Sequence, residues 1–177
     1  MIDGGLLGHL DARGVPFCLI GAAALAAHGF ARFTADVDLL TLSPDILRPA
    51  FWEGHVGEGV EIRRGDEDDP IGGVVRIRGE IVHDVILGKG YAARYAVETA
   101  RPHSRIPCKV ATPLALVLLK LEAGGAKDRL DILGLVSAQA ELGGVAWIHE
   151  VPEHLPRLSS GARTAWQTLE NDLEGRS

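Results

Sequence analysis

The sequence predicts an α+β fold, with a mixed β-sheet flanked by helices and followed by a helical C-terminal part. The stretch 1–111 alternates short apolar runs of strand length with glycine and proline breaks. From Leu114 onward, apolar residues recur at i, i+3, i+4 and i+7, which is the periodicity of an amphipathic helix. We therefore expect 1–111 to form the α/β core and 112–177 to pack on it within a single compact unit.

Strands are predicted where short apolar, β-branched runs end at glycine, proline or a charged turn. In chain order these runs are Phe17–Ile20, Asp36–Leu42, Val60–Arg63, Gly73–Arg78, Ile81–Leu87 and Arg105–Val110. Arg78, Gly79 and Glu80 predict a tight turn, so the runs on either side of it should form a hairpin.

Helices are predicted between and after the strands. Ser43 can act as an N-cap and Pro44 suits the first helical position, so we expect one helix from Pro44 to about Trp52. The other predicted helices are Leu6–Ala12, Ala22–His28, Tyr91–Val97, one that begins at Leu114, Lys127–Ala140, and a tail of short helices broken by Pro152 and Pro156 before a last one from Ala162.

Composition excludes several classes of protein. The 177 residues are 46% apolar and 24% charged, as in globular domains and unlike disordered chains. The net charge of −6 argues against an extended nucleic-acid footprint but leaves brief contact with one RNA end open. The longest apolar run, Phe17–Ala27, is shorter than the roughly 20 residues that span a bilayer. No basic stretch precedes an apolar run at the N-terminus, so we expect a cytoplasmic protein without membrane contact.

Two aspartates form the most informative pattern in the chain. Asp36 and Asp38 are two residues apart on a predicted strand, so both side chains should point to one face of the sheet. Paired carboxylates repel each other, and a divalent cation such as Mg²⁺, which prefers oxygen ligands, would relieve that repulsion. The plainer interpretation is a strand end with two solvated aspartates.

Two more positions extend this pattern. Gly21 follows a predicted strand and opens a helix, where backbone amides can approach a phosphate, although it could also be a simple turn. Asp84 is a lone charge in an apolar strand, which is costly unless it is paired or bound to metal. The alternatives are that Asp84 lies on an edge strand facing water, or that Glu80 takes its place. With Asp84, two metal ions could be held, as in metal-assisted phosphoryl transfer.

The order strand, Gly21, helix, Arg32-x-Thr34-x-Asp36-x-Asp38 resembles the DNA polymerase beta-like nucleotidyltransferases. Within them it is similar to small bacterial members, namely the abortive-infection toxin group and the minimal nucleotidyltransferases. The resemblance implies that Gly21, Ala22, Arg32 and Thr34 bind nucleotide. It also implies that Asp36, Asp38 and Asp84 bind Mg²⁺ and are catalytic.

A looser resemblance extends into the helical part. Lys120, followed by Lys127-Asp128-Arg129-x-Asp131, resembles a segment of the toxin group. Lys120 lies off the apolar stripe and could reach a phosphate. Lys127, Asp128 and Asp131 are weaker site candidates, because Lys127 and Asp131 also form an ordinary i, i+4 pair of opposite charge.

The sequence thus favours a Mg²⁺-dependent enzyme that transfers NMP from an NTP to a hydroxyl on RNA, a protein or a small molecule, in a toxin–antitoxin system. The alternative is an inactive binding module of the same fold that pairs with a cognate toxin or antitoxin protein. Ala22 motivates it, because the family usually has Ser or Gly there and a hydroxyl would bind phosphate. Trp147 and Trp166 in the tail would then offer the partner surface.

Overall fold

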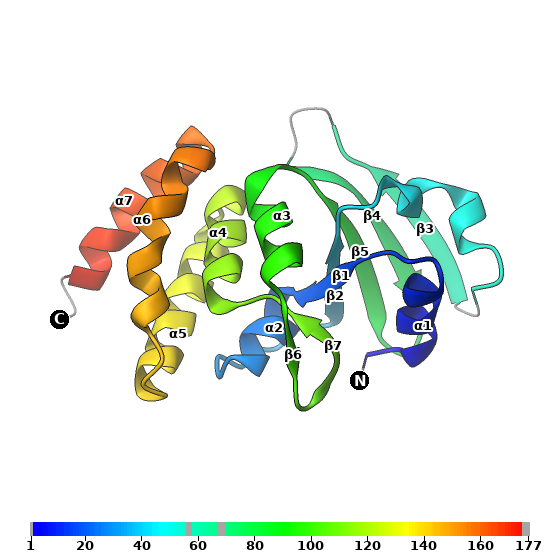
Figure 1. The fold of residues 1–177 in the computed structure, drawn as a ribbon, viewed down its shortest axis with the longest axis horizontal. Helices are drawn as coiled ribbons and strands as arrows, with labels where there is room; N and C mark the ends of the chain where they lie inside the picture. The colour runs from blue at the N-terminus through cyan, green and yellow to red at the C-terminus, as the bar shows by residue number, and fades with distance from the viewer. Residues whose placement is uncertain (1, 56–57, 67–69, 175–177) are drawn as a thin grey trace.

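The computed structural model describes residues 2–55, 58–66 and 70–174 (Figure 1). In this part of the chain, seven strands form one mixed sheet in the order β3-β4-β5-β2-β1-β7-β6. β2 lies at its centre, antiparallel to β1 and parallel to β5. The strands are β1 (Phe17–Ile20), β2 (Asp36–Thr41), β3 (Glu58–Arg64), β4 (Ile71–Arg78), β5 (Val82–Gly88), β6 (Arg101–His103) and β7 (Ile106–Val110).

The helices lie mainly at one end of the molecule, with β3 and β4 at the other (Figure 1). The α-helices are α1 (Gly4–Ala12), α2 (Gly21–Ala27), α3 (Gly90–Thr99), α4 (Pro113–Ala123), α5 (Ala126–Glu141), α6 (Val151–His154) and α7 (Ser160–Glu174). Short 3₁₀ turns are η1 (Pro44–Leu47), η2 (Pro49–Trp52), η3 (Ala146–Glu150) and η4 (Leu155–Arg157). The α+β class and the mixed sheet that the sequence predicted are confirmed.

The two faces of the sheet are covered by different elements. On one face, α3 packs against the sheet, since a Cβ added at Gly88 would lie 2.5 Å from the Cβ of Ala93. The same face carries Asp38 and Asp84, because side chains two residues apart on a strand share a face. On the other face, the side chain of Leu47 in η1 packs against Gly73 of β4. The first face is the one that holds the candidate site.

The core is aliphatic, as expected from an aromatic content of 5%. Helix α4 is its central helix, with Leu116, Val117, Leu118 and Leu121 all buried. Thr112 caps α4, because its side chain accepts a hydrogen bond from the backbone N–H of Ala115. Burying four such aliphatic side chains contributes on the order of 1.5–3 kcal/mol each. This anchors α4 firmly beside the sheet.

Four expectations need correction. The single helix from Pro44 to Trp52 is wrong: η1 and η2 are separate turns, because Pro49 disfavours a helical Arg48, which is extended at φ −96° and ψ 125°. Strand β6 was not predicted, and β7 begins at Ile106 instead of Arg105. The tail does not offer Trp166 as a partner surface, since that side chain is buried in the core.

The tail also carries Trp147, which is half-buried.

No helix among the described residues is both long enough and apolar enough to cross a membrane.

Candidate active site

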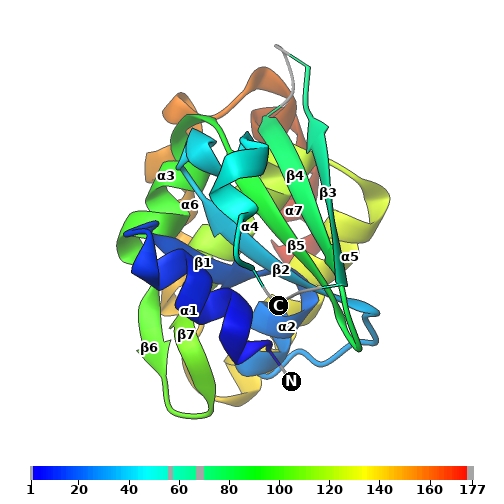
Figure 2. The same ribbon diagram turned by 90° about the vertical axis from the view of Figure 1, so that its right-hand side faces the viewer.

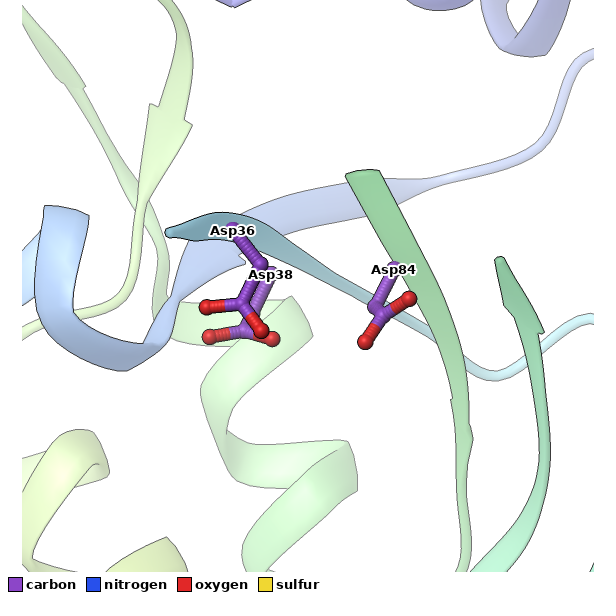
Figure 3. A group of neighbouring side chains, drawn as sticks. All are labelled: Asp36, Asp38 and Asp84. Carbon is purple, nitrogen blue, oxygen red and sulfur yellow. The ribbon is translucent and has the colours of Figure 1, made fainter. Parts of the chain in front are cut away.

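Three carboxylates meet on one face of the sheet (Figure 3). Asp36 and Asp38 come from β2, and Asp84 lies directly opposite Asp38 on the neighbouring β5. One oxygen from each of the three lies within 4.8 Å of the others. The period-2 geometry of β2 explains the first pair, and the register of β2 with β5 brings in the third. This spacing fits a divalent cation held by oxygen ligands.

The environment of Asp38 makes its ionised form costly. Burial raises the pKa of the Asp38 carboxyl to about 6, and the nearby carboxylates of Asp36 and Asp84 add to the effect. Lys120 and Arg32 oppose it by lowering that pKa. A bound cation would remove the cost, so the donor set and its charge both suit a metal.

Asp84 is held by an arginine that the sequence analysis missed. Arg76 of β4 donates from Nε to Oδ1 of Asp84 at 2.9 Å and from Nη2 to Oδ2 at 2.7 Å. Strand β5 lies inside the sheet, so the alternative of an edge-strand aspartate facing water is wrong. The bidentate pair fixes the orientation of the Asp84 carboxylate.

A second group of charges near the carboxylates comes from α4, α5 and the segment that precedes β2. The ammonium of Lys120 lies 2.8 Å from Oδ1 of Asp128 and 2.6 Å from Oδ2 of Asp131. Arg32 reaches Asp131 as well, with 2.9 Å between its Nε and Oδ1. Asp131 is only 2% exposed, so this carboxylate is the buried centre of the group. It holds the two cations that influence Asp38.

Lys127 stands apart from this group. Its side chain is exposed, and the described ion pairs of Asp131 are with Arg32 and Lys120. The i, i+4 pair of Lys127 with Asp131 that the sequence suggested is therefore not formed. Nothing in the described structure places Lys127 in the site.

A cavity of about 860 Å³ opens beside the carboxylates on the same face. Its walls are largely aliphatic, and its charged lining residues are Lys89, Lys120, Glu122 and Asp128. The lining residues come from β1, β2, β4, β5, α2, α3, α4, α5 and their connections, and include Ile20, Gly21, Leu40, Ile86, Gly88, Ala93, Leu116, Leu119 and Lys120. A cavity of this volume is in the range of small-molecule sites.

The sequence matches no protein-family profile and no curated protein. Solved structures are more informative. The solution structure of the antibiotic-resistance factor ANT(2'')-Ia matches with a TM-score of 0.51 at 18% identity, over 97% of this chain and 92% of that one. An antigenic nucleotidyltransferase-like protein from Paracoccidioides brasiliensis matches with a TM-score of 0.52 at 16% identity, over 95% and 85% of the two chains. The chain has a nucleotidyltransferase fold.

A crystal structure of ANT(2'')-Ia in complex with adenylyl-2''-tobramycin agrees with this nucleotidyltransferase fold. Its TM-score is 0.51 at 15% identity, over 85% of this chain and 95% of that chain. These similarities lend no support to the narrower resemblance to the small bacterial toxin branch. They concern the fold, whereas the roles of individual residues rest on the geometry above.

Within the nucleotidyltransferase fold, Gly21 is required by the position of Asp38. Gly21 has a positive φ of 65°, and a Cβ added there would lie 2.0 Å from Oδ2 of Asp38. The glycine therefore makes room for the carboxylate, in addition to the role in phosphate binding that the sequence suggested. Ala22, next along α2, is buried. Thr34 contributes by donating its hydroxyl to Oδ1 of Asp36 at 2.7 Å.

We expect Gly21→Ala to displace the Asp38 carboxylate and to weaken binding of Mn²⁺ or Mg²⁺ at least tenfold. The matched control is Gly14→Ala, because Gly14 has nearly the same φ of 64° but no atom within 4 Å of the added Cβ. Both variants lose about 1–2 kcal/mol from the left-handed backbone. Isothermal titration with metal separates them, and equal metal affinity in the two variants would contradict this account.

Arg76 could have been found only in part from the sequence. The predicted turn at Arg78, Gly79 and Glu80 makes β4 and β5 a hairpin and so puts Arg76 on the strand beside Asp84, but counting outward from Arg78 and Ile81 would pair Arg76 with His83. The observed register is shifted by one residue, which places Arg76 opposite Asp84. Cross-strand pairs of opposite charge are a recognised source of stability in sheets. By contrast, no local pattern indicates that Arg32 meets Asp131.

Proposed function

We propose that the protein is a nucleotidyltransferase that uses Mg²⁺ to move NMP from an NTP to a hydroxyl acceptor. The observation that carries this proposal is the cluster of Asp36, Asp38 and Asp84 beside the cavity, on a nucleotidyltransferase fold. We propose that this cluster holds two divalent metal ions. Metal bound there would polarise the phosphate and increase the acidity of the attacking hydroxyl.

The chain's own residues would then bind and orient the reactants. Asp36, Asp38 and Asp84 would be the metal ligands, and Arg76 would keep Asp84 in position. The acceptor oxygen forms a bond to the α-phosphorus while the bond to pyrophosphate breaks, and the hydroxyl proton passes to a carboxylate or to water. Lys120 and Arg32 would stabilise charge on the phosphates.

The cavity is the best place for the nucleotide. Gly21 and Lys120 line it, and its aliphatic walls can cover a base and ribose. The proposal for nucleotide binding thus includes Gly21, Ala22, Arg32, Thr34 and Lys120, with Ala22 contributing through its backbone. A role in a toxin–antitoxin system in the cytoplasm is the narrower part of this proposal, and it rests on the sequence resemblance alone.

The test is label transfer with Mg²⁺ and each α-labelled NTP, alone and with total RNA or cell lysate. We expect label to appear on an acceptor and to disappear with a chelator or in Asp36→Asn, while Lys127→Ala keeps full activity. Absence of both transfer and NTP binding would overturn the proposal and favour an inactive binding module of the same fold.

A further inference from the structure

Arginines continue the row of carboxylates across the sheet. The strand register places Arg76 of β4 opposite Asp84, and Glu61 of β3 opposite Arg76. Arg78 and Arg63 lie two residues from Arg76 and Glu61 on the same strands, so they share this face. The face of β4 and β3 beside the candidate site therefore carries Arg63, Arg76 and Arg78, which we call the arginine face.

The arginine face is open to solvent. The side chains of Arg63 and Arg78 are 66% and 68% exposed, and that of Arg76 is 38% exposed. The described helical segment that packs on β3 and β4 is η1, and it lies on the opposite face, where Leu47 contacts Gly73. Figure 2 shows the cyan turns of η1 and η2 on one side of these strands.

The charge balance of this face favours an anionic partner. Glu61 pairs with both Arg63 and Arg78, and Asp84 pairs with Arg76. Three positive guanidinium groups are therefore balanced by two carboxylates, which leaves one positive charge in excess. The pairs with Glu61 are solvent-exposed, and exposed pairs contribute little stability. Guanidinium groups bind phosphates in a bidentate manner. A phosphate could therefore replace Glu61 as the partner of Arg63 or Arg78 with little loss of folding stability.

An exposed aromatic residue lies three positions before Asp36 in the sequence. Phe33 is 91% exposed, in the connection that leads into β2. Both of its neighbours are fixed, Arg32 by Asp131 and Thr34 by Asp36. The ring is thus presented to solvent from an anchored backbone. Aromatic rings combined with cationic side chains are the usual means of binding single-stranded nucleic acid.

We propose that the arginine face and Phe33 bind the single-stranded 3′ end of an RNA acceptor. The arginines contact its phosphates, Phe33 stacks on a base, and the terminal hydroxyl reaches the carboxylates. This assignment rests on the proposed function, because it names the acceptor of that reaction. The footprint is short, which agrees with a chain whose net charge is −6.

The experiment is fluorescence anisotropy with a short, fluorescein-labelled single-stranded RNA and the full chain. We expect the double variant Arg63→Gln/Arg78→Gln to bind at least tenfold more weakly at low salt. The slope of log affinity against log salt should also fall by about 0.7 for each phosphate that the variant no longer neutralises. Phe33→Ala should lose roughly 5- to 100-fold without a change in slope, and Phe33→Trp should restore binding.

Arg48→Gln is the matched control. Arg48 is 73% exposed and paired with one carboxylate, that of Asp45, but it adjoins η1 on the other side of the sheet. RNA binding that is absent from the wild type, or that falls equally in Arg48→Gln and the double variant, would overturn the inference. Binding of a fluorescent NTP with Mg²⁺ is measured in parallel. NTP binding without RNA binding would contradict only the inference that RNA is the acceptor. RNA binding without NTP binding would contradict the proposed transferase activity.

Discussion

Asp38→Asn is expected to give a protein that transfers no nucleotide yet unfolds at a higher temperature near pH 7.5. Burial raises the pKa of the Asp38 carboxyl to about 6, with Asp36 and Asp84 adding to the shift. At pH 7.5 the wild-type carboxylate is ionised at a cost to the folded state. Asparagine removes the charge and nearly keeps the shape, so the metal-free protein gains about 1–3 kcal/mol.

The sign of the pH dependence follows from the same shift. The folded carboxyl, with a pKa near 6, holds its proton more tightly than the unfolded one, whose ordinary pKa is 3.8. The cost to stability is therefore complete above the folded pKa and absent below the unfolded pKa. The advantage of Asp38→Asn should be full at pH 7.5, shrink as the pH falls through 6, and vanish below 3.8.

Thermal unfolding followed by circular dichroism checks this expectation. Without metal, the melting temperature of Asp38→Asn should exceed that of the wild type by roughly 2–4 °C per kcal/mol gained. Added Mg²⁺ should stabilise the wild type and not the variant. The exposed carboxylate of Asp45 provides the control, Asp45→Asn, which should change neither quantity. A variant that melts lower at pH 7.5, or that retains transfer, would contradict the role given to Asp38.

Local sequence patterns predicted that Asp36 and Asp38 share one face of a strand. The other contacts of the site join residues far apart in the sequence, and local patterns did not predict them. Asp36 and Asp38 could be placed on one face because strand periodicity is a property of neighbouring residues. Their meeting with Asp84 depends on the parallel pairing of β2 with β5, which nothing local encodes. The sequence could propose Asp84 only through the cost of a lone charge in an apolar strand.

The same reasoning explains two different errors. Pro49 was visible in the sequence, and its effect on Arg48 is local, so the break between η1 and η2 could have been predicted. The role of Asp131 could not. The spacing suggested a surface pair with Lys127, whereas α5 turns Asp131 inward toward Lys120 of α4 and Arg32. Only the packing of α5 against α4 and the Arg32 segment reveals it as a buried charge.

Asp131→Asn is expected to cost about 3–5 kcal/mol of folding stability, the range seen when one member of a buried ion pair is removed. Asp131 is 2% exposed and lies within ion-pair distance of both Arg32 and Lys120. An amide cannot balance the two cations, which are themselves largely covered. We expect urea unfolding to show a lower midpoint with an unchanged slope, as for a loss of stability without a change in the unfolded state.

Asp128→Asn is the matched control, since Asp128 touches the same ammonium of Lys120 at 2.8 Å but is more exposed. Its amide oxygen can still accept the backbone N–H of Gly125 at the start of α5, so we expect a cost under about 1 kcal/mol. Adding Arg32→Met to Asp131→Asn should recover part of the stability, because the described ion pair of Arg32 is with Asp131, and its guanidinium would otherwise be left uncompensated. Equal costs for the two asparagine variants, or no recovery in the double variant, would show that Asp131 does not hold the cations of the site.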